Sequence, residues 1–137
     1  MPNNNSCPLK PVSVDFTLEN GGAIYKGSCW EACLDITERD SSTKSDTPFD
    51  LTGFLGICQI RDYSGASDIV ATPTVAIQGN RITITLDDSV TSTIPTSGKN
   101  YFDVSTYPYD LFLSKDGNNF KVLQGFIDVS PSITETV

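Results

Sequence analysis

The stretch IVATPTVAIQGNRITITL, residues 69–86, contains two apolar runs of strand length with a turn between them. The runs are Ile69 to Ile77 and Arg81 to Leu86, and Gln78-Gly79-Asn80 separates them. Glycine and asparagine accept the positive φ that tight hairpin turns require. We therefore expect an antiparallel hairpin here, and the same pattern recurs on both sides of it.

Further apolar runs of this length extend the pattern over most of the chain. Asp116-Gly117-Asn118-Asn119 separates another consecutive pair and predicts a second hairpin. The one helical signal is Asp87 to Thr91, where an aspartate can cap a single turn before Pro95. These signals predict an all-β fold, an immunoglobulin-like antiparallel β-sandwich of about seven strands with one short helical turn. The expected strands span 12–18, 30–36, 55–61, 69–77, 81–86, 107–113 and 120–129.

Alternation along the first two segments predicts which side chains face the core, because successive residues of a strand point to opposite faces. In 12–18 the apolar residues are Val12, Val14, Phe16 and Leu18. In 30–36 the predicted inner residues are Trp30, Ala32, Leu34 and Ile36, and the opposite face carries Cys29, Glu31, Cys33 and Asp35.

A chain of 137 residues is long enough for one domain with a hydrophobic core. We expect a polar N-terminal arm without a core face at 1–11, the β-sandwich domain at 12–130 and a C-terminal tail at 131–137. The segment 38–46 is charged and rich in serine and threonine, so we expect an exposed, mobile loop there.

The charge pattern narrows the class of partner. The formal net charge is −8, and no cluster of Lys and Arg is present that could follow a phosphate backbone or an anionic membrane. We therefore expect neither nucleic acid nor a membrane as a partner. No apolar run approaches the roughly 20 residues of a membrane helix, and the N-terminus lacks the pattern of a secretion signal. These features predict a protein made in the cytoplasm.

The residue types also argue against catalysis. Histidine is absent, which removes the commonest general base and the commonest zinc ligand. No combination of nucleophile, base and oxyanion donors can be assembled from the remaining residues. The acidic clusters at Asp87-Asp88 and at Asp116 to Asn119 are interpreted as a helix cap and a hairpin turn rather than as calcium ligands or paired catalytic carboxylates. We therefore expect no enzyme activity, no metal and no cofactor.

The four cysteines are Cys7, Cys29, Cys33 and Cys58. On a strand, residues four apart are separated by about 13 Å, whereas a disulfide needs Cα atoms within roughly 7 Å, so Cys29 and Cys33 cannot bond each other. Structural zinc sites usually take thiolates as close pairs, and only one pair comes near that spacing. Free thiols are the favoured interpretation, and a bridge from Cys29 or Cys33 to Cys7 or Cys58 remains an alternative.

Candidate interface residues gather in two places. Exposed aromatic rings are typical of protein or sugar contacts, and such rings are dense in 101–109. Alternation along a strand should nevertheless send about half of them into the core. A polar arm gains enough burial to order only against a partner, which adds residues of the N-terminal arm. The candidate protein-interface residues are Tyr101, Phe102, Tyr107, Tyr109, Cys7 and Leu9.

Several short blocks follow one another in a characteristic order. They are GSCW (27–30), FDLTGF (49–54), CQIRD (58–62), RITITL (81–86), IP (94–95), YDL (109–111), DG (116–117), LQG (123–125) and VSPSIT (129–134). The series resembles a family of small structural domains of phage tail and baseplate modules, related to the N-terminal domain of siphophage baseplate upper proteins. The chain departs from that family in a longer aromatic segment at 97–108 and in an additional N-terminal segment through Leu18.

The resemblance implies a non-enzymatic virion protein, a small adaptor that links tail, baseplate or fibre components. The expected partners are other phage structural proteins, and several copies or a homo-oligomer are expected in the virion after assembly in the host cytoplasm. Because the chain ends at Val137, we expect an adaptor separate from any receptor-binding part. The alternatives are a capsid decoration or neck protein and, in another class, a carbohydrate-binding module whose platform is the aromatic segment 101–109.

Overall fold

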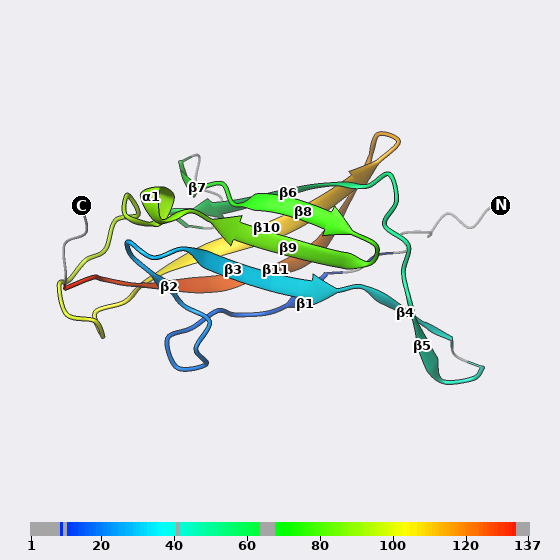
Figure 1. The fold of residues 1–137 in the computed structure, drawn as a ribbon, viewed down its shortest axis with the longest axis horizontal. Helices are drawn as coiled ribbons and strands as arrows, with labels where there is room; N and C mark the ends of the chain where they lie inside the picture. The colour runs from blue at the N-terminus through cyan, green and yellow to red at the C-terminus, as the bar shows by residue number, and fades with distance from the viewer. Residues whose placement is uncertain (1–8, 10, 41, 64–67, 134–137) are drawn as a thin grey trace.

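The computed structural model describes residues 9, 11–40, 42–63 and 68–133, and these form a β-sandwich (Figure 1). Side chains from both sheets meet in one hydrophobic core, for example Ile82 and Ile84 from one sheet and Leu111 and Ile127 from the other. The predicted all-β sandwich is therefore confirmed, while its assignment to the immunoglobulin-like kind stays a prediction.

The larger sheet has the strand order β1-β11-β10-β6-β7, and β2 also pairs with β11. Its strands are β1 (Val12–Ser13), β2 (Ile24–Tyr25), β6 (Leu55–Arg61), β7 (Ile69–Ala71), β10 (Ser105–Lys115) and β11 (Asn118–Ser130). The smaller sheet has the order β3-β9-β8, with β3 (Trp30–Asp35), β8 (Thr74–Gln78) and β9 (Arg81–Leu86). A separate hairpin joins β4 (Thr37–Asp40) to β5 (Ser45–Pro48), and the short helix α1 covers Asp88–Thr91.

Both predicted hairpins are present. β8 and β9 pair antiparallel on either side of Gly79, whose φ is 64°. β10 and β11 pair antiparallel around Asp116 and Gly117, which have φ of 52° and 80°. Two successive residues with positive φ give a turn whose twist matches that of the flanking strands. The strands of this hairpin, of 11 and 13 residues, are the longest in the described part of the chain.

The predicted single strand 69–77 is two strands that belong to different sheets. β7 pairs with β6 in the larger sheet, whereas β8 pairs with β9 in the smaller one. Thr72 and Pro73 lie between them. Because proline has no backbone N–H to donate to a ladder, the run is interrupted at this point and the chain crosses from one sheet to the other.

The prediction for 12–18 was wrong for Val12 and Val14, whereas Phe16 packs against the core as predicted. Only Val12 and Ser13 form a strand, and the Val12 and Val14 side chains are exposed. The segment instead runs parallel to β11 along its outer edge, with Val12 opposite Leu123 and Phe16 opposite Ile127. Two backbone hydrogen bonds cover that edge. Val14 N donates to Gln124 O at 2.9 Å, and Phe16 N donates to Phe126 O at 2.8 Å.

Residues 38–39 and 42–46 are exposed as predicted, but they are not irregular. β4 and β5 pair into a hairpin, which projects from the sandwich (Figure 1). Lys44 adopts a φ of 61° at the turn. The polar composition correctly predicted exposure. It did not predict the hairpin, because β4 and β5 pair through their backbones and need no apolar face to do so.

The predicted faces of the segment 30–36 are confirmed. Trp30 is buried in the core, and Ala32, Leu34 and Ile36 pack against it. The Trp30 indole donates a 2.9 Å hydrogen bond from Nε1 to the carbonyl oxygen of Gly22. Helix α1 is also where it was predicted, with Asp87 in the N-cap position, although the Asp87 side chain makes no capping hydrogen bond.

Candidate functional site

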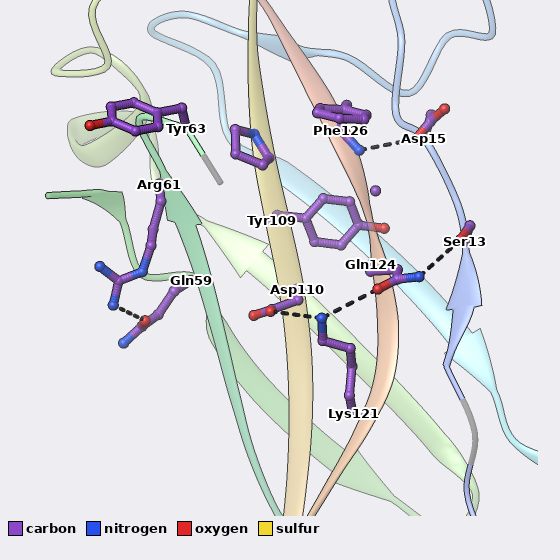
Figure 2. Close-up of a pocket in the computed structure, with 12 residues that line it drawn as sticks. Ser13, Asp15, Gln59, Arg61, Tyr63, Tyr109, Asp110, Lys121, Gln124 and Phe126 are labelled. Carbon is purple, nitrogen blue, oxygen red and sulfur yellow. Dashed lines mark hydrogen bonds and ion pairs between the residues drawn. The ribbon is translucent and has the colours of Figure 1, made fainter. Parts of the chain in front are cut away.

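A groove of about 430 Å³ lies on the outer face of the larger sheet, on the side away from the core (Figure 2). Four strands and the segments next to them contribute to it. The lining residues are Ser13, Asp15, Gln59, Arg61, Tyr63, Pro108, Tyr109, Asp110, Lys121, Gln124, Gly125 and Phe126.

Strand register places a row of polar side chains across the floor of this groove. Ser13 of β1 pairs with Gln124 of β11, Gln124 pairs with Asp110 of β10, and Asp110 pairs with Gln59 of β6. Directly paired residues of neighbouring strands share a face of the sheet. We call Ser13, Gln124, Asp110 and Gln59 the polar row.

Lys121 connects two members of the polar row, and Arg61 contacts a third. Lys121 Nζ lies 3.4 Å from Asp110 Oδ2 and donates to Gln124 Oε1 at 3.3 Å. Gln124 Nε2 donates to Ser13 Oγ at 3.3 Å, and Arg61 Nη2 donates to Gln59 Oε1 at 2.8 Å. Most of these contacts are long and partly solvent-exposed, so a ligand can replace them at low cost.

Aromatic rings flank one end of the groove. Tyr63 and Phe126 lie on opposite sides of it (Figure 2), with 65% and 51% of their surface exposed. A second hollow of about 340 Å³ shares Gln59, Arg61 and Asp110 with the groove. It continues toward the opposite end of the strands and adds Ile57, Phe112 and Asn119. The two hollows thus lie next to each other on the outer face of β6 and β10.

The exposed members of the predicted interface are Tyr101 and Phe102. Their side chains are 62% and 60% exposed, and the two rings pack edge to face with centroids 5.4 Å apart. We call these two residues the aromatic pair. They sit in the connection between α1 and β10, at the end of the sandwich opposite the β4–β5 hairpin (Figure 1).

Hydrogen bonds hold the connection that carries the aromatic pair. Ser97 N donates to Ser105 Oγ at 3.0 Å, and Asn100 N donates to Asp103 Oδ2 at 3.1 Å. Ser130 Oγ, at the end of β11, donates to the Tyr101 carbonyl oxygen at 2.6 Å. The rings are therefore exposed on a segment whose backbone is fixed to the sandwich.

The other two aromatic residues of the predicted interface require correction. Tyr107 and Tyr109 are buried and belong to the core. Their hydroxyls donate to the backbone carbonyl oxygens of Pro95 and Val14, and burial raises the pKa of both phenols. Alternation along β10 turns these rings inward, so they do not extend the aromatic pair into a platform.

The N-terminal candidates have different outcomes. Leu9 is buried and packs in the hydrophobic core of its own chain, so the prediction that the arm has no core face was wrong at this position. Cys7 lies outside the described residues. The interface prediction for it stays a prediction.

Three of the cysteines are free thiols in the structure. Cys29 and Cys33 are exposed, and Cys58 is buried. Cys58 points into the core from β6, whereas Cys33 lies on the outer face of the smaller sheet, so these two cannot form a bridge. Burial raises the pKa of the Cys58 thiol to about 12, and the nearby Asp110 carboxylate adds to this effect. Cys7 lies outside the described residues, so the alternative of a bridge to it stays open.

The groove was not predicted from the sequence. A partial signal exists in β6 and β10, where Gln59 and Asp110 alternate with the buried Cys58 and Leu111. This signal identifies outward-facing polar residues but not their neighbours on other strands. The position of Ser13 beside Gln124 depends on a parallel pairing between residues 111 positions apart.

The sequence matches no protein-family model and no curated protein. Within residues 9, 11–40, 42–63 and 68–133, no helix is long and apolar enough to cross a membrane. In the same part of the chain, no three or more Cys, Asp or Glu side chains come together in a way that could hold a metal ion.

Proposed function

We infer that this chain is a non-enzymatic structural protein of a phage virion, a small adaptor that joins tail, baseplate or fibre components in several copies. Two independent features support this proposal. The ordered series of sequence blocks resembles the phage tail and baseplate domains described above. The fold is a small β-sandwich, an architecture that presents loops and strand edges to neighbouring proteins.

The observation that carries the proposal is the aromatic pair. Tyr101 and Phe102 pack on each other but are largely exposed. Isolated exposed apolar residues are common, but two adjacent large rings on a fixed backbone are typical of the anchor residues of protein interfaces. Fixing the backbone in advance lowers the entropy cost of binding.

The alternative location is the head or neck of the particle. A decoration protein would use the same exposed rings, so the aromatic pair does not distinguish the two locations. The carbohydrate-binding platform at 101–109 is not favoured, because two of its four rings, Tyr107 and Tyr109, lie in the core.

Cross-linking in intact particles tests the proposal. Lys99 is exposed and lies two positions before Tyr101, so an amine-reactive reagent should link it to the protein that covers the aromatic pair. We expect mass spectrometry of digested particles to identify links from Lys99 to tail, baseplate or fibre proteins. Lys44, at the tip of the β4–β5 hairpin, serves as the matched exposed lysine and should give fewer such links.

Each outcome of this experiment has a clear meaning. Links from Lys99 to the major capsid protein would show that the chain belongs to the head and not to the tail. Absence of the chain from purified particles would refute a virion role.

A complementary test replaces both rings, Tyr101→Ser with Phe102→Ser. This double variant should fold but fail to enter particles, whereas Tyr63→Ser should enter them normally.

A further inference from the structure

We propose that the groove on the outer face of the larger sheet is a binding site for a neutral carbohydrate. This site is distinct from the aromatic pair and goes beyond the adaptor role. The proposal rests on the charge balance of the groove, on the kinds of polar groups in it, and on the aromatic rings next to those groups.

The groove is electrically balanced although the chain is strongly acidic. The whole chain has a formal charge of −8. Among the described lining residues, the charged side chains are Asp15 and Asp110 against Arg61 and Lys121. An anionic ligand would meet two carboxylates here, and a cationic ligand would meet two basic groups. A neutral ligand gains most from such a lining, because like-charge repulsion is absent.

The polar groups offer donors and acceptors side by side. Gln59 and Gln124 each carry both an amide donor and a carbonyl acceptor, Asp110 accepts, and Lys121 donates. Sugar hydroxyls also donate and accept, so neighbouring hydroxyls can pair with such mixed groups. The Lys121 to Asp110 and Lys121 to Gln124 contacts measure 3.4 and 3.3 Å, which leaves these groups available for shorter bonds to a ligand.

The rings supply the apolar part of the recognition. Tyr63 and Phe126 flank one end of the groove (Figure 2), and Phe112 lies in the adjoining hollow. Pyranose rings have apolar C–H faces that stack on aromatic rings while their hydroxyls point outward to polar groups. Phe126 and Phe112 lie on either side of the polar row along β10 and β11. A polar row with aromatic rings on both sides therefore fits a sugar better than it fits an apolar peptide side chain.

The dimensions favour more than one sugar unit. The main groove measures about 430 Å³, which lies in the roughly 300–1,000 Å³ range of small-ligand sites. The second hollow of about 340 Å³ lies next to it and shares Gln59, Arg61 and Asp110 with it. A short linear oligosaccharide would fill both hollows across β6 and β10.

Binding of neutral oligosaccharides to the full 137-residue chain tests the proposal. An array of neutral oligosaccharides identifies bound sugars, and NMR titration with the strongest of them, or with maltotriose and chitotriose if none stands out, locates the site. We expect chemical-shift changes at Gln59, Asp110 and Gln124. Affinity should fall at least about tenfold in Gln59→Ala and in Phe126→Ala, because each removes a direct ligand contact.

Phe102→Ala is the matched control, since it removes an exposed ring at another site and should leave sugar affinity unchanged. Thermal unfolding of each variant verifies that it is folded. Absence of shift changes with all of these sugars at millimolar concentration would overturn the proposal. So would shifts that appear away from the groove, or shifts in the groove that depend on protein concentration alone, which would assign the face to a second copy of the chain. Failure here leaves the adaptor proposal intact, because the particle experiment depends on the aromatic pair and changes a groove residue, Tyr63, only as its control.

Discussion

The hydroxyl of Tyr109 donates a 2.6 Å hydrogen bond to the backbone carbonyl oxygen of Val14, 95 positions earlier in the chain. Gly125 of β11 lies between them, because it is the direct cross-strand partner of Tyr109. A Cβ atom at Gly125 would collide with the same Val14 carbonyl oxygen. The absence of a side chain at Gly125 thus lets the phenol cross β11 and hold the N-terminal segment on the edge of the sheet beneath the groove.

Removal of this hydroxyl should destabilise the fold. In Tyr109→Phe the Val14 carbonyl loses a partly buried donor, and we expect the free energy of unfolding to fall by about 1–2 kcal/mol. Urea denaturation followed by tryptophan fluorescence measures the change, because Trp30 lies in the same core. Tyr25→Phe removes an exposed hydroxyl and is the control. An equal effect of the two variants would contradict the role of the Tyr109 bond.

Addition of one methyl group at Gly125 should separate the N-terminal segment from β11. We expect Gly125→Ala to lower the free energy of unfolding by about 3 kcal/mol, because neither the Val14 backbone nor Asp15 Oδ1 can move without loss of hydrogen bonds. Hydrogen exchange should also accelerate at the amides of Val14 and Phe16. Asn119→Ala, at an exposed position of the same strand, should leave both measurements nearly unchanged. Unaltered exchange at these two amides in Gly125→Ala would refute the prediction.

Thr91 connects the short helix to the turn before β3. Its fully buried hydroxyl donates to the Ser28 carbonyl oxygen at 2.9 Å and accepts from Gly27 N at 3.1 Å. Thr91→Val keeps the shape but leaves both backbone groups unpaired, so we expect a loss of about 1–3 kcal/mol. Thermal unfolding measures it. Thr93→Val changes an exposed threonine two positions later, and a comparable loss in that control would show that the Thr91 bonds are not the cause.

The cysteines should differ sharply in reactivity. In a Cys7→Ser background, two thiols, Cys29 and Cys33, should react quickly with an aromatic disulfide reagent near neutral pH. Cys58 should react only after denaturation, because it is buried and its pKa is raised to about 12. Rapid reaction of all three thiols in the folded protein would show that the core opens around β6.

The same thiol should make the fold sensitive to alkali. Burial raises the pKa of Cys58 from 9.0 to about 12 in the folded chain, so above pH 9 the unfolded chain releases this proton first. The stabilising effect of the neutral thiol is complete below pH 9 and is lost as the pH rises toward 12, by about 1.4 kcal/mol per pH unit. Tyr107 and Tyr109, whose pKa values are also raised, add to the loss at higher pH.

The variant Cys58→Val isolates the contribution of the thiol. Denaturant titrations between pH 8 and pH 11 should show a shallower decline in the free energy of unfolding than in the natural chain, with the difference opening near pH 9. Parallel declines in the two proteins would mean that Cys58 ionises to the same extent in the folded and in the unfolded chain.

Local features predicted those parts of the fold that depend on neighbours along the chain. The alternation around Trp30 placed the inner face of β3 correctly, and the Gly79 and Asp116-Gly117 turns placed both hairpins. Alternation also predicted that about half of the rings in 101–109 face the core, but it did not say which ones. In the structure they are Tyr107 and Tyr109. The prediction failed for Val12 and Val14, where an apolar alternation lies on an edge segment and faces solvent.

The sequence alone therefore determined the fold class, the hairpins and the face on which Cys29 and Cys33 are exposed, because turns and alternation are properties of adjacent residues. Only the tertiary structure decided that β7 and β8 enter different sheets, that the N-terminal segment runs parallel to β11, and that Leu9 is buried. It also decided the groove, since Ser13, Gln124, Asp110 and Gln59 become neighbours only through strand register. Pairing between distant strands depends on the total burial and hydrogen bonding of the whole chain, and no short stretch of sequence contains that information.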